Sequence, residues 1–351
     1  MPDDLVERLN NAAVATLELY HVYLGERLGL YRVLGAAGPL TSDELAARAG
    51  IHERYAREWL EQQAVAGILH AESAKYSLPR EHAEALVDAD SVNFLAPLGQ
   101  AVVGIGGVMP KVVEAFRTGA GVPYEAYGAD MRGAISALNR PAFLSLLGSE
   151  WFPAVPDLDA RLRAAPPARV ADVGCGTGWS SIAIALAYPS VHVEGIDIDQ
   201  ASILEARRNA LAGGVADRVT FEARDAADPN LAGLFDVVTA FETIHDMAHP
   251  VDALRAMLGL ARATGHVIVM DEKVPDQLSA PGDDIARFHH AWSAVHCLPV
   301  GMGEPGSAGT GSVMRTSTLR RYAREAGFTD VEVLPIGHES WRFYRLVLPR
   351  A

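Results

Sequence analysis

The chain has 351 residues, which suggests two domains, and 49% of them are hydrophobic, enough to form sizeable cores. Its formal charge of −14 argues against nonspecific binding to nucleic acid or to an anionic membrane. The acidic N-terminus lacks the features of a secretory signal, and the apolar residues 102–109 are too few to span a bilayer. Cys175 and Cys297 are the only cysteines, so a disulfide framework is not expected. These features predict a soluble, cytoplasmic protein without membrane contact.

The first 95 residues have the pattern of a small helical domain. Apolar residues recur at helical spacing from Val14 to Leu28, just before Gly29. Thr41 or Ser42 can cap a second helix, and a further helix is expected over residues 52–66. Two short strands around residues 67–70 and 75–78 follow. A helix, a turn, a helix and a small hairpin indicate a winged helix-turn-helix over residues 1–95.

The charge of this winged helix argues against DNA binding. Its expected recognition helix carries Arg54 and Arg57 against three acids, Glu53, Glu58 and Glu61. A helix that lies against phosphates should be basic. We therefore expect this domain to form a homodimer contact or a lid. A winged-helix DNA-binding regulator that senses a small molecule remains the alternative from a different functional class.

The pattern changes near residue 165. Residues 96–165 are expected to form a helical connector or lid, with a helix starting near Pro141 and a proline-rich boundary at residues 153–169. After this boundary, strands and helices alternate, which is typical of a parallel sheet covered on both faces. The expected strands are 169–173, 191–197, 219–223, 235–241 and 266–271. The expected helices are 180–187, 201–212 and 250–260.

A glycine-rich turn follows the first of these strands. Gly174, Gly176 and Gly178 allow a sharp turn and the close approach of a ligand. Trp179 stands where the dinucleotide fingerprint would have its third glycine, so a ligand without a pyrophosphate is expected. Asp197 ends the second strand, where ribose hydroxyls would lie. Asp225 follows the third strand and could accept from an exocyclic amine.

The motifs VADVGCGTG, GIDID and ARDA resemble those of class I S-adenosylmethionine-dependent methyltransferases. Nearly the whole chain resembles the bacterial subgroup that carries an N-terminal winged-helix domain. This resemblance implies a Rossmann-like α/β fold with a seven-stranded sheet, in which residues 330–335 and 341–347 form an antiparallel hairpin. It also implies a methyltransferase domain over residues 166–351, with a substrate-cap insertion at about 275–315, and a small-molecule enzyme of secondary metabolism.

The resemblance also implies which residues bind S-adenosylmethionine, with S-adenosylhomocysteine as the product. The glycines of the turn would lie at the methionine part, Asp197 at the ribose, and Asp225 with Ala226 at the adenine. The chain near Phe241 and Glu242 would close the site over the sulfonium. The full expected set is Asp172, Gly174, Cys175, Gly176, Gly178, Asp197, Ile198, Asp225, Ala226, Phe241 and Glu242.

His245 and Asp246 follow the fourth strand, where related O-methyltransferases carry a histidine–aspartate pair whose histidine removes the acceptor's proton. Histidine titrates close enough to neutral pH for this role. Met247 departs from the family, which commonly has tryptophan there, and in some relatives the histidine only packs under the substrate. His245 is therefore expected to be the general base of an O-methyltransferase, oriented by Asp246. The alternative is a C- or N-methyltransferase without base catalysis.

No metal is expected. Catechol-type methyltransferases bind a cation through an adjacent Asp-Asn pair after the fifth strand. This strand ends in Asp271, Glu272 and Lys273, and the lysine would compete with a cation. The segment HHAWSAVHC (289–297) offers two His or Cys pairs at helical spacing, which is weak support for structural zinc. It is better interpreted as part of a cap over the substrate, continued by the glycine-rich loop 301–311.

The methyl acceptor is expected to be a small molecule, best an aromatic or polycyclic hydroxyl compound. Its expected contacts form an aromatic and weakly polar set: Tyr20, Tyr23, Trp151, Trp292, His296, Met302 and Trp341. No basic cluster that would suit a phosphorylated substrate is evident.

Overall fold

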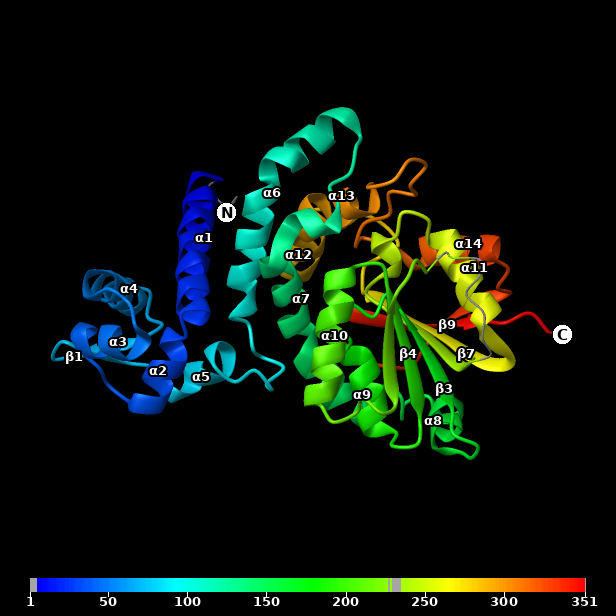
Figure 1. Cartoon of the computed structure of the whole chain (residues 1–351). Coiled ribbons are helices and arrows are strands. Elements are labelled where there is room, and N and C mark those ends of the chain that lie inside the picture. The colour runs from blue at the N-terminus through cyan, green and yellow to red at the C-terminus, as the bar shows by residue number, and fades with distance from the viewer. Residues whose placement is uncertain (1–4, 227, 229–234, 351) are drawn as a thin grey trace. The chain divides into compact units, whose positions relative to one another are not determined.

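The computed structural model describes residues 5–226, 228 and 235–350. Contacts between residues divide the chain into two compact units, which can be followed by residue number in Figure 1. The first unit ends at Gly107 and also includes Tyr127–Pro141. The second comprises Val108–Ala126 and the chain from Ala142 onward, so the connector expected over residues 96–165 is shared between the two units. Among the described helices, none has the length and apolar character needed to cross a membrane.

The first unit contains the predicted winged helix-turn-helix. Thr41 caps the first helix of the motif: its hydroxyl accepts from the Glu44 N–H, and its own N–H donates to the Glu44 carboxylate. Gly50 ends that helix in a left-handed conformation. The elements are α1 (Leu5–Arg27), α2 (Leu30–Ala37), α3 (Ser42–Ala49), α4 (Glu53–Val65), β1 (His70–Glu72), β2 (Lys75–Ser77) and α5 (Arg80–Leu86).

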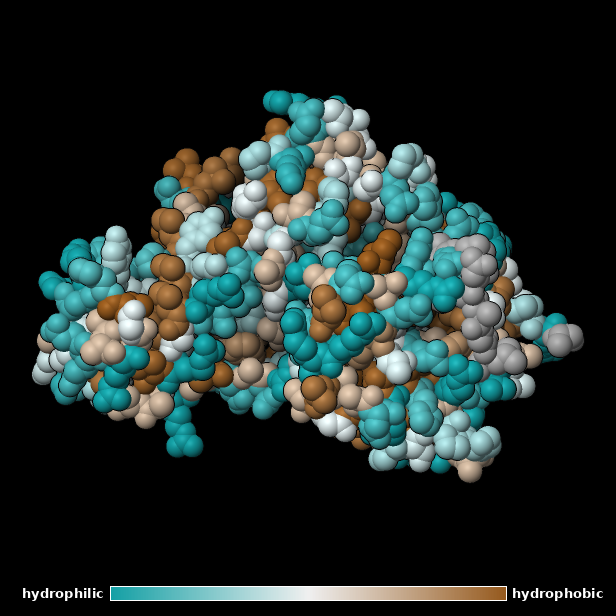
Figure 2. Space-filling view, in the orientation of Figure 1, coloured by the Kyte–Doolittle hydropathy of each residue, from teal (hydrophilic) through white to brown (hydrophobic). Residues whose placement is uncertain are grey.

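The apolar stripe of α1 is largely exposed. Only Val22 and Gly25 of this helix are buried. Figure 2 shows the hydrophobic surface over α1. The exposed apolar side chains between Leu5 and the start of α2 are Leu5, Val6, Leu9, Val14, Leu17, Tyr20, Leu24 and Leu28. Scattered apolar side chains are ordinary on a protein surface, whereas large exposed apolar patches are typical of interaction surfaces.

Both arginines of α4 are paired on their own helix. Arg57 donates to Glu53 at 2.7 Å, and Arg54 forms an ion pair with Glu58. The arginines are therefore partly neutralised by neighbours one turn away. The charge that α4 presents to solvent is therefore not strongly basic.

Pro141 lies inside a helix, which corrects the prediction that a helix starts there. α7 (Gly128–Ala142) runs through Pro141 and continues into a π-helical segment, η2 (Phe143–Trp151). A proline in a helix removes one hydrogen bond and crowds the preceding turn, so a change to wider turns allows the chain to continue. The elements around it are α6 (Pro97–Thr118), η1 (Tyr124–Tyr127) and α8 (Pro156–Arg163).

The second unit has the predicted seven-stranded sheet, in the order β5-β4-β3-β6-β7-β9-β8. The first five strands in this order are parallel, and β9 runs antiparallel to both β7 and β8. The strands are β3 (Arg169–Val173), β4 (His192–Asp197), β5 (Val219–Ala223), β6 (Phe235–Phe241), β7 (Ala261–Glu272), β8 (Asp330–Val333) and β9 (Trp341–Val347). The C-terminal hairpin was predicted correctly.

Helices cover both faces of this sheet, and each face has its own hydrophobic core. The predicted helices correspond to α9 (Trp179–Ala187), α10 (Gln200–Ala212) and α11 (Pro250–Leu260), and α14 (Thr316–Ala326) was not predicted. Because β3 and β6 are adjacent and parallel, the glycine turn and the His245 segment leave the sheet at the same edge.

Asp172, near the carboxyl end of the inner strand β3, provides a test of this packing. Its buried carboxylate accepts from the hydroxyls of Ser180 and Ser181 at 2.6 Å and of Thr239 at 2.8 Å. Asp172→Ala should lower the free energy of unfolding by about 1–3 kcal/mol, because the buried hydroxyls of Ser180 and Ser181 lose this acceptor and that of Thr239 keeps only the Ala171 carbonyl at 3.3 Å. Urea denaturation would measure this change.

Glu194→Ala is the matched control, because it removes a carboxylate of the neighbouring strand that is 46% exposed in an ion pair with Arg169. An exposed pair contributes at most about 1 kcal/mol. Equal losses of stability in the two variants would contradict the structural role of Asp172.

Candidate functional site

The glycine turn between β3 and α9 forms one side of the candidate site. Gly174, Gly176 and Gly178 all have positive φ values, of 68°, 52° and 84°. A side chain at Gly174 would collide with Thr243, and one at Gly178 would collide with Phe221. The space beside Gly176 is open. The turn is therefore packed from two directions and accessible at its middle, as a ligand cradle requires.

Asp172 and Cys175 lie beneath this turn and not on its open side. Asp172 is 1% exposed, and its carboxylate is bound by three hydroxyls. Cys175 is buried as well, and burial raises the pKa of its thiol well above the ordinary value. Both residues were predicted to bind the cofactor. Their burial favours a supporting role under the glycine turn.

Two carboxylates extend the cradle along the sheet edge. Asp197 accepts from the backbone N–H groups of Gly176 and Asp199, each at 2.8 Å. A carboxylate has about four acceptor positions, so two remain for a ligand. Asp225 is exposed beyond the end of β5, and Ala226 is half-buried. Ile198, which follows Asp197, is 70% exposed.

The chain leaves β6 through a strained residue. Glu242 has φ 51°, a backbone conformation that residues other than glycine rarely adopt. Its N–H donates to the Met270 carbonyl at 2.8 Å, and its carboxylate accepts from the Trp341 indole at 2.6 Å. These bonds hold the turn that leads to His245. Phe241, immediately before it, is buried in the core against Phe143.

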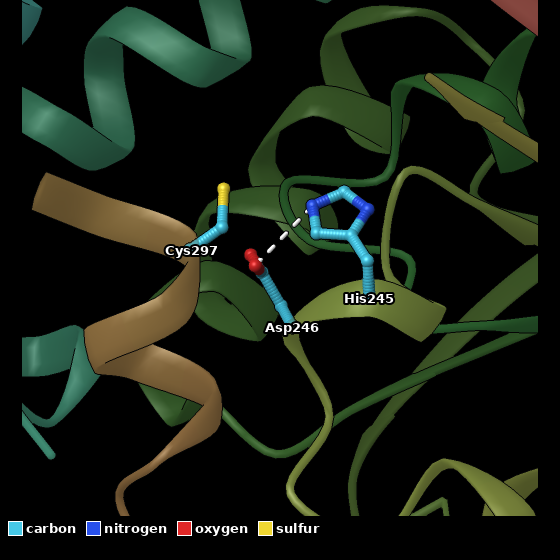
Figure 3. Close-up of side chains that lie close together, drawn as sticks. All are labelled: His245, Asp246 and Cys297. Carbon is cyan, nitrogen blue, oxygen red and sulfur yellow. Dashed lines mark ion pairs between the residues drawn. The ribbon is translucent and has the colours of Figure 1, made fainter. Parts of the chain in front are cut away.

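His245 is buried in a cluster of three carboxylates. Its Nδ1 lies 2.7 Å from Asp271 Oδ1 and 3.1 Å from Glu272 Oε2, and its Nε2 lies 3.2 Å from Asp246 Oδ1. Figure 3 shows the Asp246 carboxylate directed to the imidazole. The side chain of His245 is 2% exposed and that of Asp246 is 25% exposed. Asp271 therefore lies on the Nδ1 side of the ring, and Asp246, which was expected to orient the imidazole, lies on the Nε2 side.

The carboxylates determine the protonation of this cluster. Burial by itself would lower the pKa of His245, but Asp271, Glu272 and Asp246 raise the pKa well above its ordinary value. Burial raises the pKa of Glu272, against the opposing effect of the imidazolium. For Asp246, burial would raise the pKa, yet the neighbouring imidazolium holds the pKa below its usual value. The three carboxylates therefore favour the protonated form of His245.

A cap formed by later parts of the second unit packs on His245. The Gly311 N–H donates to the His245 carbonyl at 3.1 Å, and the Ala308 N–H donates to the Ala248 carbonyl at 2.9 Å. The helical part of the cap comprises α12 (Asp284–Trp292), η4 (Ser293–Cys297) and α13 (Leu298–Gly301). Residues 308 and 311 of the expected cap thus contact the chain that follows β6, and the covering of a substrate by residues 275–315 stays a prediction.

Of the predicted acceptor contacts, three belong to this cap: Trp292, His296 and Met302. Trp292 and Met302 are partly exposed, whereas His296 is buried, with its ring 5.9 Å from Trp292 and 6.0 Å from Tyr124. Tyr124 was not predicted.

Three of the other predicted acceptor contacts, Trp151, Trp341 and Tyr23, have structural partners. Trp151 is 1% exposed and packs edge-on against Trp341, whose indole binds Glu242. Tyr20 and Tyr23 lie on α1 in the first unit. Tyr20 is exposed, and Tyr23 donates to Asp130 at 3.2 Å.

Sequence reasoning missed the contribution of Asp271 and Glu272. Their position in the sequence could have indicated this contribution, because both residues end β7, which is parallel and adjacent to β6. Carboxyl ends of adjacent parallel strands meet at one edge, so acids there are close to whatever follows β6. Thr243 and Cys297 were missed as well, because only the folded chain brings them to Gly174 and Asp246.

Comparison with known proteins identifies two regions of the chain. Residues 166–299 match a family described as "Methyltransferase domain", and residues 15–88 match the "Rv2258c-like winged HTH domain". The ubiquinone biosynthesis O-methyltransferase of Marinobacter nauticus is 37% identical over 103 residues, which are 29% of this chain and 42% of that protein. The chain thus spans less than half of the length of this relative.

Solved structures match over the whole chain. An O-methyltransferase family protein from Burkholderia thailandensis superposes with a TM-score of 0.73 at 17% identity, covering 100% of both chains. Human N-acetylserotonin methyltransferase in complex with SAM gives a TM-score of 0.72 at 16% identity, covering 99% of both chains. Such low identities establish the fold alone. The chain therefore combines an Rv2258c-like winged helix-turn-helix domain, over residues 15–88, with a methyltransferase domain, over residues 166–299.

Proposed function

We propose that this protein transfers a methyl group from S-adenosylmethionine to a hydroxyl of a small aromatic or polycyclic molecule, with His245 as the general base. The observation that carries this proposal is the buried hydrogen bond of 2.7 Å between His245 Nδ1 and Asp271, at the edge that also bears the glycine turn. An acid that holds one ring nitrogen leaves the other directed to a reacting group.

The residues of the cradle fit S-adenosylmethionine. The open space beside Gly176 suits the methionine part, and the remaining acceptor positions of Asp197 suit two ribose hydroxyls. Asp225 is exposed at the next strand end, where an adenine amine can donate to it. When bound, the cofactor supplies an electrophilic methyl group on a sulfonium. The chain itself holds this ligand and places His245 at the same sheet edge.

The acceptor hydroxyl would replace Asp246 at His245 Nε2. Asp246 is the most exposed of the three acids, so it can yield this position without opening the core. His245 takes the proton only as a neutral imidazole. Because the carboxylates raise the pKa of His245, the neutral form appears only as the pH rises above the ordinary histidine range. Turnover should therefore increase with pH on the alkaline side of about 6.5.

His245→Ala should lower turnover by roughly 10²–10⁴-fold, the usual contribution of a general base. Affinity for S-adenosylhomocysteine should stay nearly unchanged, because the cradle lies on other strands. Single-turnover kinetics with labelled S-adenosylmethionine and calorimetry would measure the two quantities. His245→Asn should be similarly slow, since an amide cannot accept the proton.

Asp246→Asn is the matched control for the pH dependence. Removing this negative charge destabilises the imidazolium and lowers the pKa of His245, so the pH–rate profile should move to lower pH. A His245→Ala enzyme with most of its turnover and a flat pH profile would eliminate the base. The reaction would then be methylation of a carbon or nitrogen that is already nucleophilic.

Asp197→Ala should weaken binding of S-adenosylmethionine by about 1–3 kcal/mol, because two ribose hydroxyls lose their acceptor. Isothermal titration calorimetry would measure this loss. Glu222→Ala removes a carboxylate of β5 that is 66% exposed, and it should leave the affinity unchanged. Unchanged affinity in Asp197→Ala as well would remove the proposed ribose contact.

The exposed stripe of α1 supports a homodimer as part of this proposal. A second copy presents the same stripe, and two such apolar faces can cover each other around a two-fold axis. The ion pairs within α4 and the net negative charge of the chain favour this role over DNA binding.

Leu9→Glu combined with Leu17→Glu should convert the dimer to a monomer, because two charges would be buried without partners. Light scattering at micromolar concentration would determine the mass. Leu211→Glu changes an apolar side chain of α10 that is 74% exposed, and this control should remain a dimer. A monomeric wild-type protein would refute the proposed dimer.

A further inference from the structure

Cys297 lies beside the His245 cluster, although the proposed reaction does not use it. Its side chain is buried at the end of η4 in the cap. One potential metal-ligand atom from each of His245, Asp246 and Cys297 lies within 4.8 Å of the other two. Figure 3 shows these side chains together, with the cysteine on one segment and the other two residues on another. Nitrogen, oxygen and sulfur donors thus converge from separate parts of the chain.

This donor set suits zinc. Thiolate, imidazole and carboxylate are the three side-chain ligands that zinc takes in proteins, and many sites use three of them with a fourth position open. Two such ligands, each about 2.0–2.2 Å from one ion in tetrahedral geometry, lie roughly 3.4 Å apart. His245 Nε2 and Asp246 Oδ1 are 3.2 Å apart. This pair therefore already has the separation of two ligands of one ion.

Asp271 supports this arrangement from the opposite side of the His245 ring. Its carboxylate lies 2.7 Å from His245 Nδ1, so the Nδ1 proton is held there and Nε2 is the nitrogen directed to Asp246. Histidines that bind zinc almost always donate their other N–H to such an acceptor, which fixes the ring and makes it a stronger ligand. Asp246 thus lies at the ring nitrogen that would bind a metal, and Asp271 supports the other ring nitrogen.

The local charge also favours a cation. Asp246, Asp271 and Glu272 surround one imidazole, so negative groups outnumber the positive one in a buried region. Lys273 was expected to compete with a cation here, but its ammonium donates to the His338 carbonyl at 3.0 Å. Lys273 is thus bound to the chain before β9, and the missing Asp-Asn pair still distinguishes this cluster from a catechol-type cation site.

We propose that His245 Nε2, Asp246 and Cys297 form a binding site for zinc or a similar divalent cation, supported by Asp271. On binding, the cation takes the Nε2 lone pair, a carboxylate oxygen and the thiolate sulfur. The imidazolium and the thiol each release one proton to solvent. Affinity should therefore fall as the pH is lowered.

Occupation of this site has a consequence that rests on the proposed function. The cation and the acceptor's proton need the same lone pair of His245 Nε2. A bound zinc ion would thus prevent His245 from acting as a base and inhibit methyl transfer. Removal of zinc by a chelator would restore turnover.

Titration of the full-length chain with zinc and with cobalt tests the site. Calorimetry should give one equivalent of zinc per chain, and bound cobalt should show a thiolate-to-metal charge-transfer band. Cys297→Ala should lower zinc affinity by at least about a hundredfold and abolish the band, and Asp271→Asn should lower it about 10–100-fold. Cys175→Ala, which removes the other buried cysteine, should retain both signals.

Absence of stoichiometric zinc binding by the wild-type chain would overturn the proposal, whatever the variants do. The proposal would also be overturned if Cys297→Ala bound zinc as tightly as the wild type, or if the cobalt complex lacked the thiolate band. Inhibition is a separate readout. If zinc binds with the predicted cysteine dependence while turnover continues, the metal site stands and the role of His245 as base fails.

Discussion

Adjacent parallel strands end at the same edge of a sheet, and the candidate site depends on this constraint. β6 and β7 deliver His245 and Asp271 to one point, although 26 positions separate them in the chain. β3 and β4 bring the glycine turn and Asp197 to the same edge. The hydrogen bond between His245 and Asp271 is buried, so the imidazole is fixed by the sheet itself. The strand ends thus hold the glycine turn and the His245 segment at one edge of the sheet.

The two sides of the site are coupled through the chain after β6. Thr243 fills the space above Gly174, and Glu242 is tied by its backbone to β7 and by its side chain to Trp341 on β9. The strained φ of Glu242 is maintained because these contacts over-determine it. Displacement of this turn would therefore disturb the cradle and His245 together.

The three carboxylates around His245 affect both of the proposed roles of this residue, general-base catalysis and cation binding. A raised pKa keeps the ring protonated near neutral pH, which opposes general-base catalysis until the pH rises or a carboxylate is displaced. The same negative charge would attract a cation, and Cys297 would supply the soft ligand of the proposed zinc site. The proposed base catalysis and the proposed metal binding would compete for the same ring nitrogen, Nε2 of His245.

The sequence by itself determined the strands of the sheet, the helices α9, α10 and α11 between them, the winged helix-turn-helix and the turn of Gly174 and Gly176 beside Asp197. These features are local, because glycine conformations, caps and alternating apolar patterns are written in neighbouring residues. Only the tertiary structure decided that Asp271 holds His245, that Lys273 turns away to His338, and that Cys297 reaches Asp246. These contacts join residues distant in the chain, and their geometry follows from strand register and the path of the cap, which spacing along a sequence does not encode.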